Sequence, residues 1–119
     1  MNDSFSKMTF SERVVAEYLQ HLNIRWSYEQ PLFVWDRDGR PRVWAPDFYL
    51  VQFGIYLEVC GSGLVDYSYR KKVFEENGYP VIFLKTYKSA PHWQTFLMHS
   101  LEFYVSLHYR NLAKVKLKK

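Results

Sequence analysis

The chain has 119 residues, of which 48% are hydrophobic, 24% charged and 19% aromatic, and its formal net charge is +4. This length predicts one domain, and the composition excludes collagen-like and intrinsically disordered proteins. No apolar run approaches the ~18 residues that span a bilayer, and residues 1–10 lack the apolar segment of a signal peptide. We therefore expect a cytoplasmic protein without membrane association.

The only cysteine, Cys60, excludes an internal disulfide and a multi-cysteine zinc site. Residues 1–113 carry 12 basic and 12 acidic side chains, so the net charge comes from lysines after them. We expect a single domain over 1–113 and a basic tail over 114–119, whose Lys114 and Lys116 would contact nucleic acid. Such a tail permits a nucleic-acid partner without demonstrating one, and a tail without contacts is the alternative.

The first predicted element is a helix from about Phe10 to Leu22. Its apolar residues recur at the spacing of one helical face: Val15, Tyr18, Leu19 and Leu22. Thr9, followed by Glu12 three residues later, is a capping-box pattern that predicts where the helix begins.

Three segments rich in β-forming residues come next, at 25–35, 42–51 and 55–60. The sequence Asp36-Arg37-Asp38-Gly39 predicts a turn between the first two. A short break at Gln52-Phe53-Gly54 separates the second segment from the third. Consecutive strands with short connections indicate an antiparallel meander.

A second helix is predicted from a cap at Asp66 to Asn77-Gly78. The apolar run Val81-Ile82-Phe83-Leu84 predicts a strand buried on both faces. The resulting element order is α-β-β-β-α-β-α, a mixed sheet with helices in the α/β or α+β range.

A long amphipathic stretch after Pro91 predicts a final helix. We interpret its aromatic residues, from Trp93 to Tyr109, mostly as core. The alternative is that some of them form a dimer face.

Three carboxylates on separate elements are the candidates for chemistry. Pro46-Asp47 lies in the second strand and Glu58 near the end of the third, so a hairpin would bring them together, while strand alternation places Glu58 and Cys60 on one face. Glu12 leans towards the packed face of the first helix. Clustered carboxylates repel unless they share a proton or a cation, and their hard oxygens suit Mg²⁺ or Mn²⁺. Such an ion can activate water and polarise a phosphodiester.

Glu12, Pro46-Asp47 and Glu58-x-Cys60, in the order helix, strand, strand, resemble the PD-(D/E)xK nuclease superfamily. The resemblance covers about residues 9–87 and implies a restriction-endonuclease-like α-β-β-β-α-β core with an added C-terminal helix. Local similarity extends to two branches of endonucleases. The segment from Tyr28-Glu29-Gln30-Pro31 through Pro46-Asp47-Phe48 is similar to transposon end-cleaving enzymes, and Glu58-Val59-Cys60-Gly61 with Tyr67, Arg70, Phe74, Gly78 and Val81 is similar to very-short-patch-repair enzymes.

The resemblance implies Mg²⁺-dependent cleavage of DNA, with Mn²⁺ as a substitute. Asp47 and Glu58 would bind the metal, and Glu12 would complete or orient its ligand shell. DNA is the implied partner. Because many enzymes of this fold cut two strands as dimers, a homodimer through the C-terminal helix is a further expectation.

Cys60 stands where the motif has a lysine, and a thiol cannot offer a fixed positive charge. We expect the cation to come from Arg70 or Lys71, near the inner face of the second helix, with Lys72 pointing more towards solvent. These three basic residues are also the predicted nucleic-acid contacts of that helix.

Each of these residues also has a purely structural interpretation. Glu12 alone completes a helix cap, Pro46-Asp47 fits a strand-edge turn, and Cys60 fits a small buried hydrophobe. Lys71 and Lys72 are spaced to pair with Glu75 and Glu76 on a solvated face. The histidines have no ligand spacing and are interpreted as surface or satisfied core residues: His21, His92, His99 and His108.

Two other functions therefore compete with the nuclease. The first is a catalytically degenerate nuclease fold that binds nucleic acid or a protein. The second is a purely structural protein.

Overall fold

The computed structural model describes residues 4–117, in which two helices are followed by five strands, a helix, a strand and a long final helix. In chain order its elements are α1 (Ser4–Lys7), α2 (Phe10–His21), β1 (Trp26–Tyr28), β2 (Leu32–Trp35), β3 (Pro41–Trp44), β4 (Phe48–Leu50), β5 (Ile55–Cys60), α3 (Ser68–Glu76), β6 (Val81–Lys85) and α4 (Ala90–Leu117). The predicted mixed α/β class with a C-terminal helix is confirmed.

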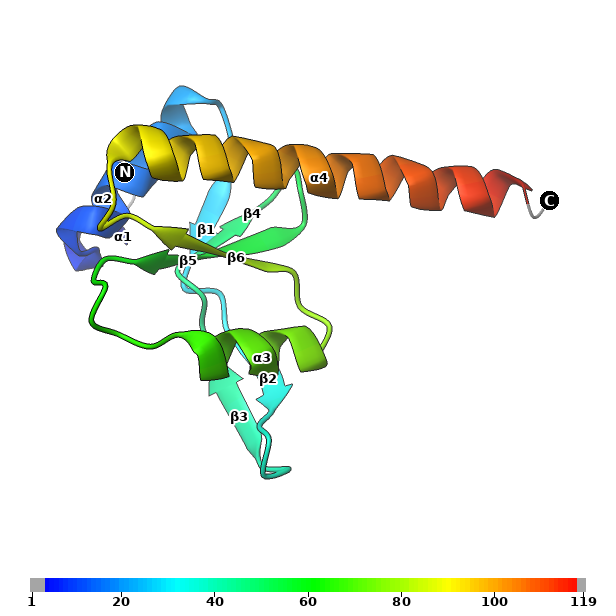
Figure 1. The fold of residues 1–119 in the computed structure, drawn as a ribbon, viewed down its shortest axis with the longest axis horizontal. Coiled ribbons are helices and arrows are strands. Elements are labelled where there is room, and N and C mark those ends of the chain that lie inside the picture. Colours follow the sequence, from blue (N-terminus) through cyan, green and yellow to red (C-terminus); the bar gives the residue numbers. More distant parts are fainter. Residues whose placement is uncertain (1–3, 118–119) are drawn as a thin grey trace.

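The main sheet has the strand order β1-β4-β5-β6 (Figure 1). Its first two pairings, β1 with β4 and β4 with β5, are antiparallel, whereas β6 joins β5 in parallel. The expected meander is present, and the final strand makes the sheet mixed. β6 and β1 are the two edge strands.

The two long strands predicted at 25–35 and 42–51 are each broken in the middle, and this part of the prediction is wrong. Their first and last thirds pair in two places, Tyr28 with Phe48 in the main sheet and Leu32 with Trp44 in a separate hairpin of β2 and β3. Pro31 and the buried Pro46 lie in the break. Because proline has no N–H to donate, it interrupts a strand ladder.

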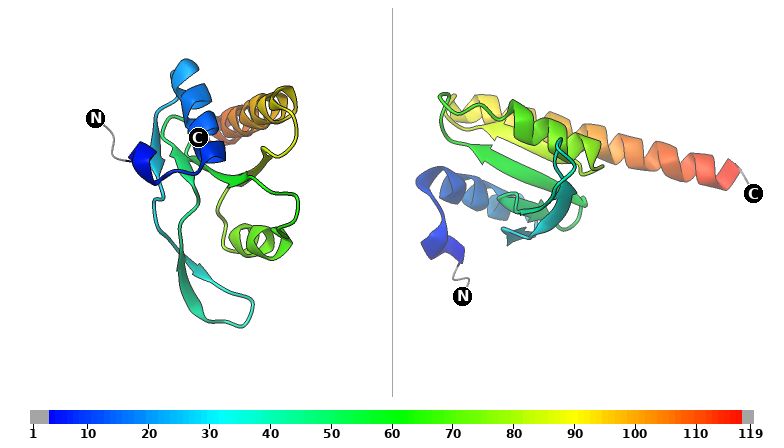
Figure 2. Two further views of the ribbon diagram at one scale, coloured as in Figure 1. Left: turned by 90° about the vertical axis from the view of Figure 1, so that its left-hand side faces the viewer. Right: turned by 90° about the horizontal axis from the view of Figure 1, so that it is seen from below.

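Helices cover both faces of the main sheet (Figures 1 and 2). On one face, α2 and α4 pack on the sheet through the larger core, which contains Leu19, Leu57 and Leu97. On the other face, α3 and the β2–β3 hairpin form a smaller core, with Phe74 from the helix and Val34 from the hairpin. The alternation of β5 side chains serves both cores, so the face that carries Glu58 is the face towards α3.

The predicted ends of the first two long helices are close to those observed. At α2, the Thr9 side chain accepts from the Glu12 N–H while the Glu12 side chain accepts from the Thr9 N–H, which confirms the capping box. At α3 the N-cap is Tyr67, one residue after the predicted Asp66, whose carboxylate accepts from the N–H and hydroxyl of Ser68. The chain leaves α3 through Gly78 at φ +78°, a backbone conformation that glycine adopts without strain.

α4 is much longer than the sheet on which it packs. Trp93, Leu97 and Leu101 are buried, but Phe103 and Tyr109 are 57% and 67% exposed, so the interpretation of the aromatic run as mostly core is wrong. A 28-residue helix spans ~42 Å, whereas the five residues of β6 span ~17 Å. The second half of α4 therefore projects beyond the body (Figure 1). Within residues 4–117, no helix is both long and apolar enough to cross a membrane.

Candidate functional site

Asp47 is held at the point where the chain re-enters the main sheet. It follows the buried Pro46 and directly precedes β4. The backbone N–H of Val59 on β5 donates to its Oδ2 at 2.6 Å. A strand neighbour therefore fixes the carboxyl group, which is more than an ordinary edge turn would require.

Glu58 is a buried carboxylate in the most apolar strand, with 8% of its surface exposed. Arg70 of α3 donates from Nε to its Oε2 at 2.9 Å. The other oxygen, Oε1, is buried and has no hydrogen-bond partner. Burial raises the pKa of Glu58 despite the opposing charge of Arg70. One oxygen of this residue is thus free to accept a proton or a cation.

Glu12 reaches the same place from the first turn of α2. Its Oε1 accepts from the Thr9 N–H at 3.0 Å and from the Tyr28 hydroxyl at 2.7 Å. Burial raises the pKa of Asp47 to about 8, with further contributions from the charge of Glu58 and from a hydrogen bond with Glu12. The structure therefore brings together the three carboxylates that the sequence analysis singled out.

The cluster is not arranged as a closed metal centre. Among the described residues, no three His, Cys, Asp or Glu side chains are grouped so that they could hold an ion together. Thr9 and Tyr28 hold one oxygen of Glu12, and Arg70 holds one oxygen of Glu58. The free Oε1 of Glu58 and the neighbouring carboxyl group of Asp47 nevertheless fit a hard divalent cation, because such an ion binds carboxyl oxygens and needs one that has no other partner.

Cys60, at the lysine position of the motif, is a buried neutral thiol. It is 2% exposed, and its Sγ lies 3.9 Å from the Glu58 carbonyl oxygen, to which it donates. Burial raises its pKa to about 12, reinforced by the charges of Glu58 and Asp47. It therefore has no positive charge to offer, and its surroundings are those of a small buried hydrophobe.

Arg70 is the basic residue that contacts the cluster. Its guanidinium lies over two aromatic rings that contact each other edge to face, 4.9 Å from the centroid of Trp44 and 5.1 Å from that of Phe74, and it donates to the Ala45 carbonyl at 3.4 Å. Lys71 instead faces α4, and Lys72 is exposed. Of the basic residues predicted on this helix, Arg70 alone is in position to act beside the carboxylates.

The predicted lysine–glutamate pairs of α3 are absent from the described ion pairs, so that interpretation is wrong. Glu76 pairs instead with Arg37 of the hairpin turn, at 3.5 Å. Among the described residues, neither Lys71 nor Lys72 has a carboxylate within ion-pair distance.

The remaining predicted residues lie away from the cluster. Lys114 is exposed on α4, and the side chain of Lys116 lies outside the described part. All four histidines are exposed, as the sequence analysis expected: His21, His92, His99 and His108.

Tyr28 is the site residue that the sequence analysis missed. Burial and the hydrogen bond to Glu12 raise the pKa of its phenol, so it stays a donor that orients Glu12. The alternation of β1 offered a weak signal, since it places Tyr28 on the same face as Trp26. Its partner, 16 residues away, depends on how α2 crosses the sheet.

Replacing Thr9 by alanine is expected to lower the free energy of unfolding by about 1 kcal/mol, because the Glu12 N–H loses its side-chain acceptor. Glu12 keeps its bonds to the Thr9 N–H and Tyr28, so its carboxylate stays in place. Urea unfolding measures the change, with Thr95→Ala on the exposed face of α4 as the control. Equal stability of Thr9→Ala and wild type would contradict the observed cap.

The carboxylate cluster is the functional evidence for this protein, since no similar protein was found. Comparison with protein-family models, with curated proteins and with solved structures found no match to this chain.

Proposed function

We propose that the protein is a divalent-metal-dependent endonuclease that hydrolyses DNA phosphodiester bonds. The observation that carries this proposal is a half-buried Asp47 whose pKa is raised by burial and by the neighbouring carboxylates of Glu58 and Glu12. Buried acidic groups with strongly raised pKa values, gathered from separate elements, are typical of functional sites. The order of the acidic residues along the chain supports the PD-(D/E)xK resemblance.

In this proposal Asp47 and the free Oε1 of Glu58 hold the ion, and Glu12 completes its surroundings. A bound Mg²⁺ or Mn²⁺ would polarise the phosphodiester and lower the pKa of a bound water molecule. The chain's own contribution is positioning. The Val59 N–H fixes Asp47, Tyr28 orients Glu12, and Arg70 supplies the positive charge that Cys60 lacks.

A second candidate is a nuclease fold that has lost activity and binds nucleic acid or a protein. Two observations favour it. The motif's lysine position holds a neutral Cys60, and the cation that replaces it already occupies one oxygen of Glu58.

A homodimer belongs to the nuclease proposal. The apolar side chains that α4 exposes beyond the body are where a second copy would pack, among them Leu107, Tyr109 and Leu112. Two copies would bring one carboxylate cluster to each strand of a duplex.

The test is cleavage of supercoiled plasmid, single-stranded DNA and branched DNA, in Mg²⁺, in Mn²⁺ and in EDTA. Wild type is compared with Asp47→Asn, which keeps an acceptor for Val59 but cannot ionise. The matched control is Asp38→Asn, which removes an exposed carboxylate from the hairpin turn. We expect metal-dependent cleavage by wild type and control, and a loss of at least about a hundredfold in Asp47→Asn.

Linear plasmid as an early product would support the dimer, and nicked plasmid alone would count against it. Mn²⁺ binding without cleavage of any substrate would favour the degenerate fold. Equal cleavage by wild type and Asp47→Asn would refute the assignment of the site.

A further inference from the structure

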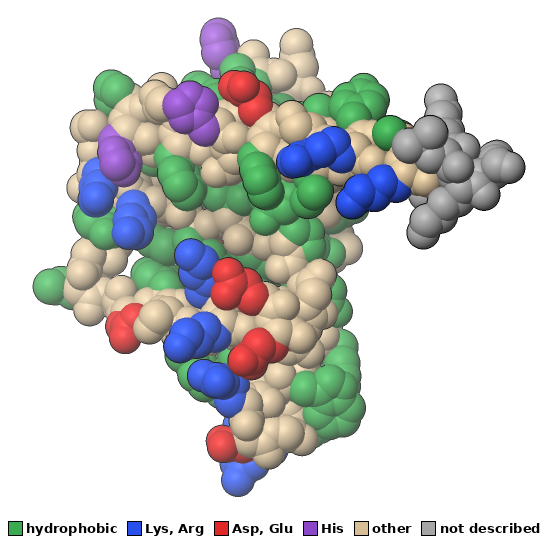
Figure 3. Space-filling view, turned by 45° about the vertical axis from the view of Figure 1, so that its right-hand side comes forward, with side chains coloured by type: hydrophobic (Ala, Val, Ile, Leu, Met, Phe, Trp, Pro, Cys, Tyr) green, Lys and Arg blue, Asp and Glu red, His purple; other side chains and the backbone are tan. Residues whose placement is uncertain are grey.

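A groove of about 980 Å³ runs between α3 and α4 along the edge strand β6. Figure 3 shows basic and hydrophobic side chains along this hollowed face, with acidic side chains next to some of the basic ones. It is separate from the carboxylates, since Glu12, Asp47 and Glu58 do not line it. Because β6 is the edge strand, no further strand fills the space between α3 and α4.

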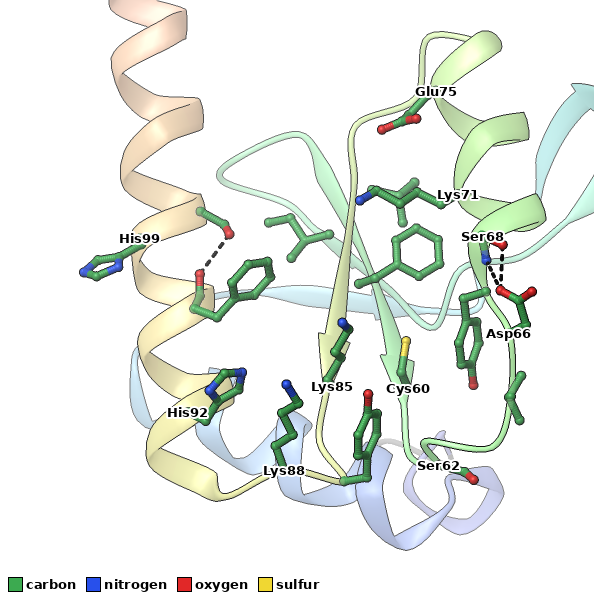
Figure 4. Close-up of a pocket in the computed structure, with 18 of the residues that line it drawn as sticks. Cys60, Ser62, Asp66, Ser68, Lys71, Glu75, Lys85, Lys88, His92 and His99 are labelled. Carbon is green, nitrogen blue, oxygen red and sulfur yellow. Dashed lines mark hydrogen bonds between the residues drawn. The ribbon is translucent and has the colours of Figure 1, made fainter.

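The groove combines basic side chains with aromatic rings. Lys71 from α3, Lys85 from β6 and Lys88 from the following turn extend into it, and His92 lies on the α4 side (Figure 4). Its aromatic residues come from four parts of the chain: Tyr67, Phe83, Tyr87, Phe96, Phe103 and Tyr104.

The acidic side chains in the lining do not cancel this charge. Only two are present, and the carboxylate of Asp66 already accepts two hydrogen bonds from Ser68. The other, Glu75, is outnumbered by three lysines. The groove is therefore suited to a ligand that is both anionic and rich in flat rings.

One end of the groove lies close to the carboxylate cluster, although the three carboxylates do not line it. Cys60, in the lining, lies two residues beyond Glu58 on the same face of β5. Tyr67, also in the lining, packs its ring 6.1 Å from that of Phe83. Burial raises the pKa of Tyr67, and the charges of Glu58 and Asp47 contribute. A ligand lying along β6 would thus pass close to the carboxylate cluster at the Cys60 end.

We propose that this groove binds a single-stranded segment of DNA and leads it to the carboxylate cluster. Lysines along a groove contact phosphates, and exposed rings such as Phe96 and Phe103 stack on bases. Stacking of this kind requires unpaired bases, since in a duplex the base faces are covered by their neighbours. The inference rests on the proposed nuclease function for the identity of the ligand, but binding does not require cleavage.

The experiment measures binding of a fluorescent oligothymidylate of about 16 nucleotides by anisotropy, in EDTA and over a range of salt concentrations. The groove variant is Lys85→Ala/Lys88→Ala. The control, Lys7→Ala/Arg25→Ala, removes the same charge near β1 at the opposite edge of the sheet. All four side chains are exposed, so both variants are expected to fold.

We expect wild type and control to bind alike, and the groove variant to bind at least about tenfold more weakly. Losing two phosphate contacts should also reduce the slope of log affinity against log salt by about 1.4. Phe96→Leu/Phe103→Leu, which keeps apolar volume but removes both rings, should weaken binding about tenfold or more without changing that slope.

Several results would overturn the groove proposal: no binding by wild type at low salt, equal losses in groove variant and control, or equally strong competition by a duplex of the same length. Competition by an acidic peptide, but not by unlabelled oligothymidylate, would assign the groove to a protein partner instead. Cleavage in Mg²⁺ is scored separately. Binding without cleavage would support the groove proposal and contradict the nuclease proposal. Cleavage at the wild-type rate by the groove variants would support the nuclease proposal and contradict the groove proposal.

Discussion

The Asp47→Asn variant, free of metal, is expected to be more stable than wild type near pH 8 and equally stable near pH 4. Aspartate in an unfolded chain ionises with a pKa close to its ordinary value, whereas burial and two neighbouring carboxylates raise the pKa of folded Asp47 to about 8. A group whose pKa is raised by folding stabilises the folded state below its unfolded pKa. That stabilisation is lost as pH rises towards the folded value.

Wild type should therefore lose stability between about pH 4 and pH 8 through this group, by on the order of a few kcal/mol. Asparagine does not titrate, so the difference between variant and wild type should grow over the same interval. Urea unfolding in EDTA at about pH 4.5, 6 and 8 measures it. Asp38→Asn, at an exposed position, should show no comparable trend.

Metal should invert the order of stability near pH 8. If Mg²⁺ replaces the proton at Asp47, the ion stabilises wild type in proportion to the logarithm of its concentration and has little effect on Asp47→Asn. A variant and a wild type that unfold alike at every pH, with and without metal, would show that Asp47 is not buried among carboxylates.

Replacing Arg70 by methionine is expected to lower the free energy of unfolding by about 3 kcal/mol near pH 8. Methionine keeps the apolar contacts with Trp44 and Phe74, so the change isolates the loss of charge. Without Arg70, both oxygens of the buried Glu58 lack a partner, because Oε1 has none already. An unpaired buried charge is far more costly than the pair it replaces.

The cost should shrink in acid. Burial already raises the pKa of Glu58, and removing Arg70 raises it further, so below that pKa the carboxyl takes up a proton and the penalty disappears. Adding Glu58→Gln to Arg70→Met should recover most of the lost stability near pH 8. Lys72→Met, two residues further along and on the exposed side of α3, should change stability by less than about 0.5 kcal/mol. A similar loss in both single variants would mean that the helix, rather than the ion pair, is responsible.

Local sequence patterns were sufficient for most of the element order. The capping box at Thr9 and the apolar spacing after it defined α2, because both signals lie within a few residues of one another. The proline breaks at 31 and 46 were visible in the sequence, yet the strands were predicted as continuous. A proline breaks a strand only where its missing N–H would have donated to a neighbouring strand. Which strands are neighbours is decided by the pairing of the sheet.

The residue types of the site could be predicted from the sequence, whereas the contacts between its side chains could not. The types and order of Glu12, Asp47 and Glu58 sufficed to single them out. Glu58 was the clearest of the three, because burying an unpaired carboxylate in an apolar strand costs free energy. The rotation of α3 against β5 decided that Arg70 reaches Glu58 while Lys71 faces the groove. The crossing of α2 over the sheet decided that Tyr28 meets Glu12.

The same division holds for α4 and the groove beside it. Periodicity determined that residues after Pro91 form an amphipathic helix, but how much of that helix is buried depends on the length of the sheet beneath it. Although a helix rises less per residue than a strand, the 28 residues of α4 extend well past the five residues of β6 whatever their own pattern. The sequence determined which side chains the protein has for chemistry and in which elements they lie. Tertiary structure decided which of them meet, because the distances between elements are set by packing between residues far apart in the chain.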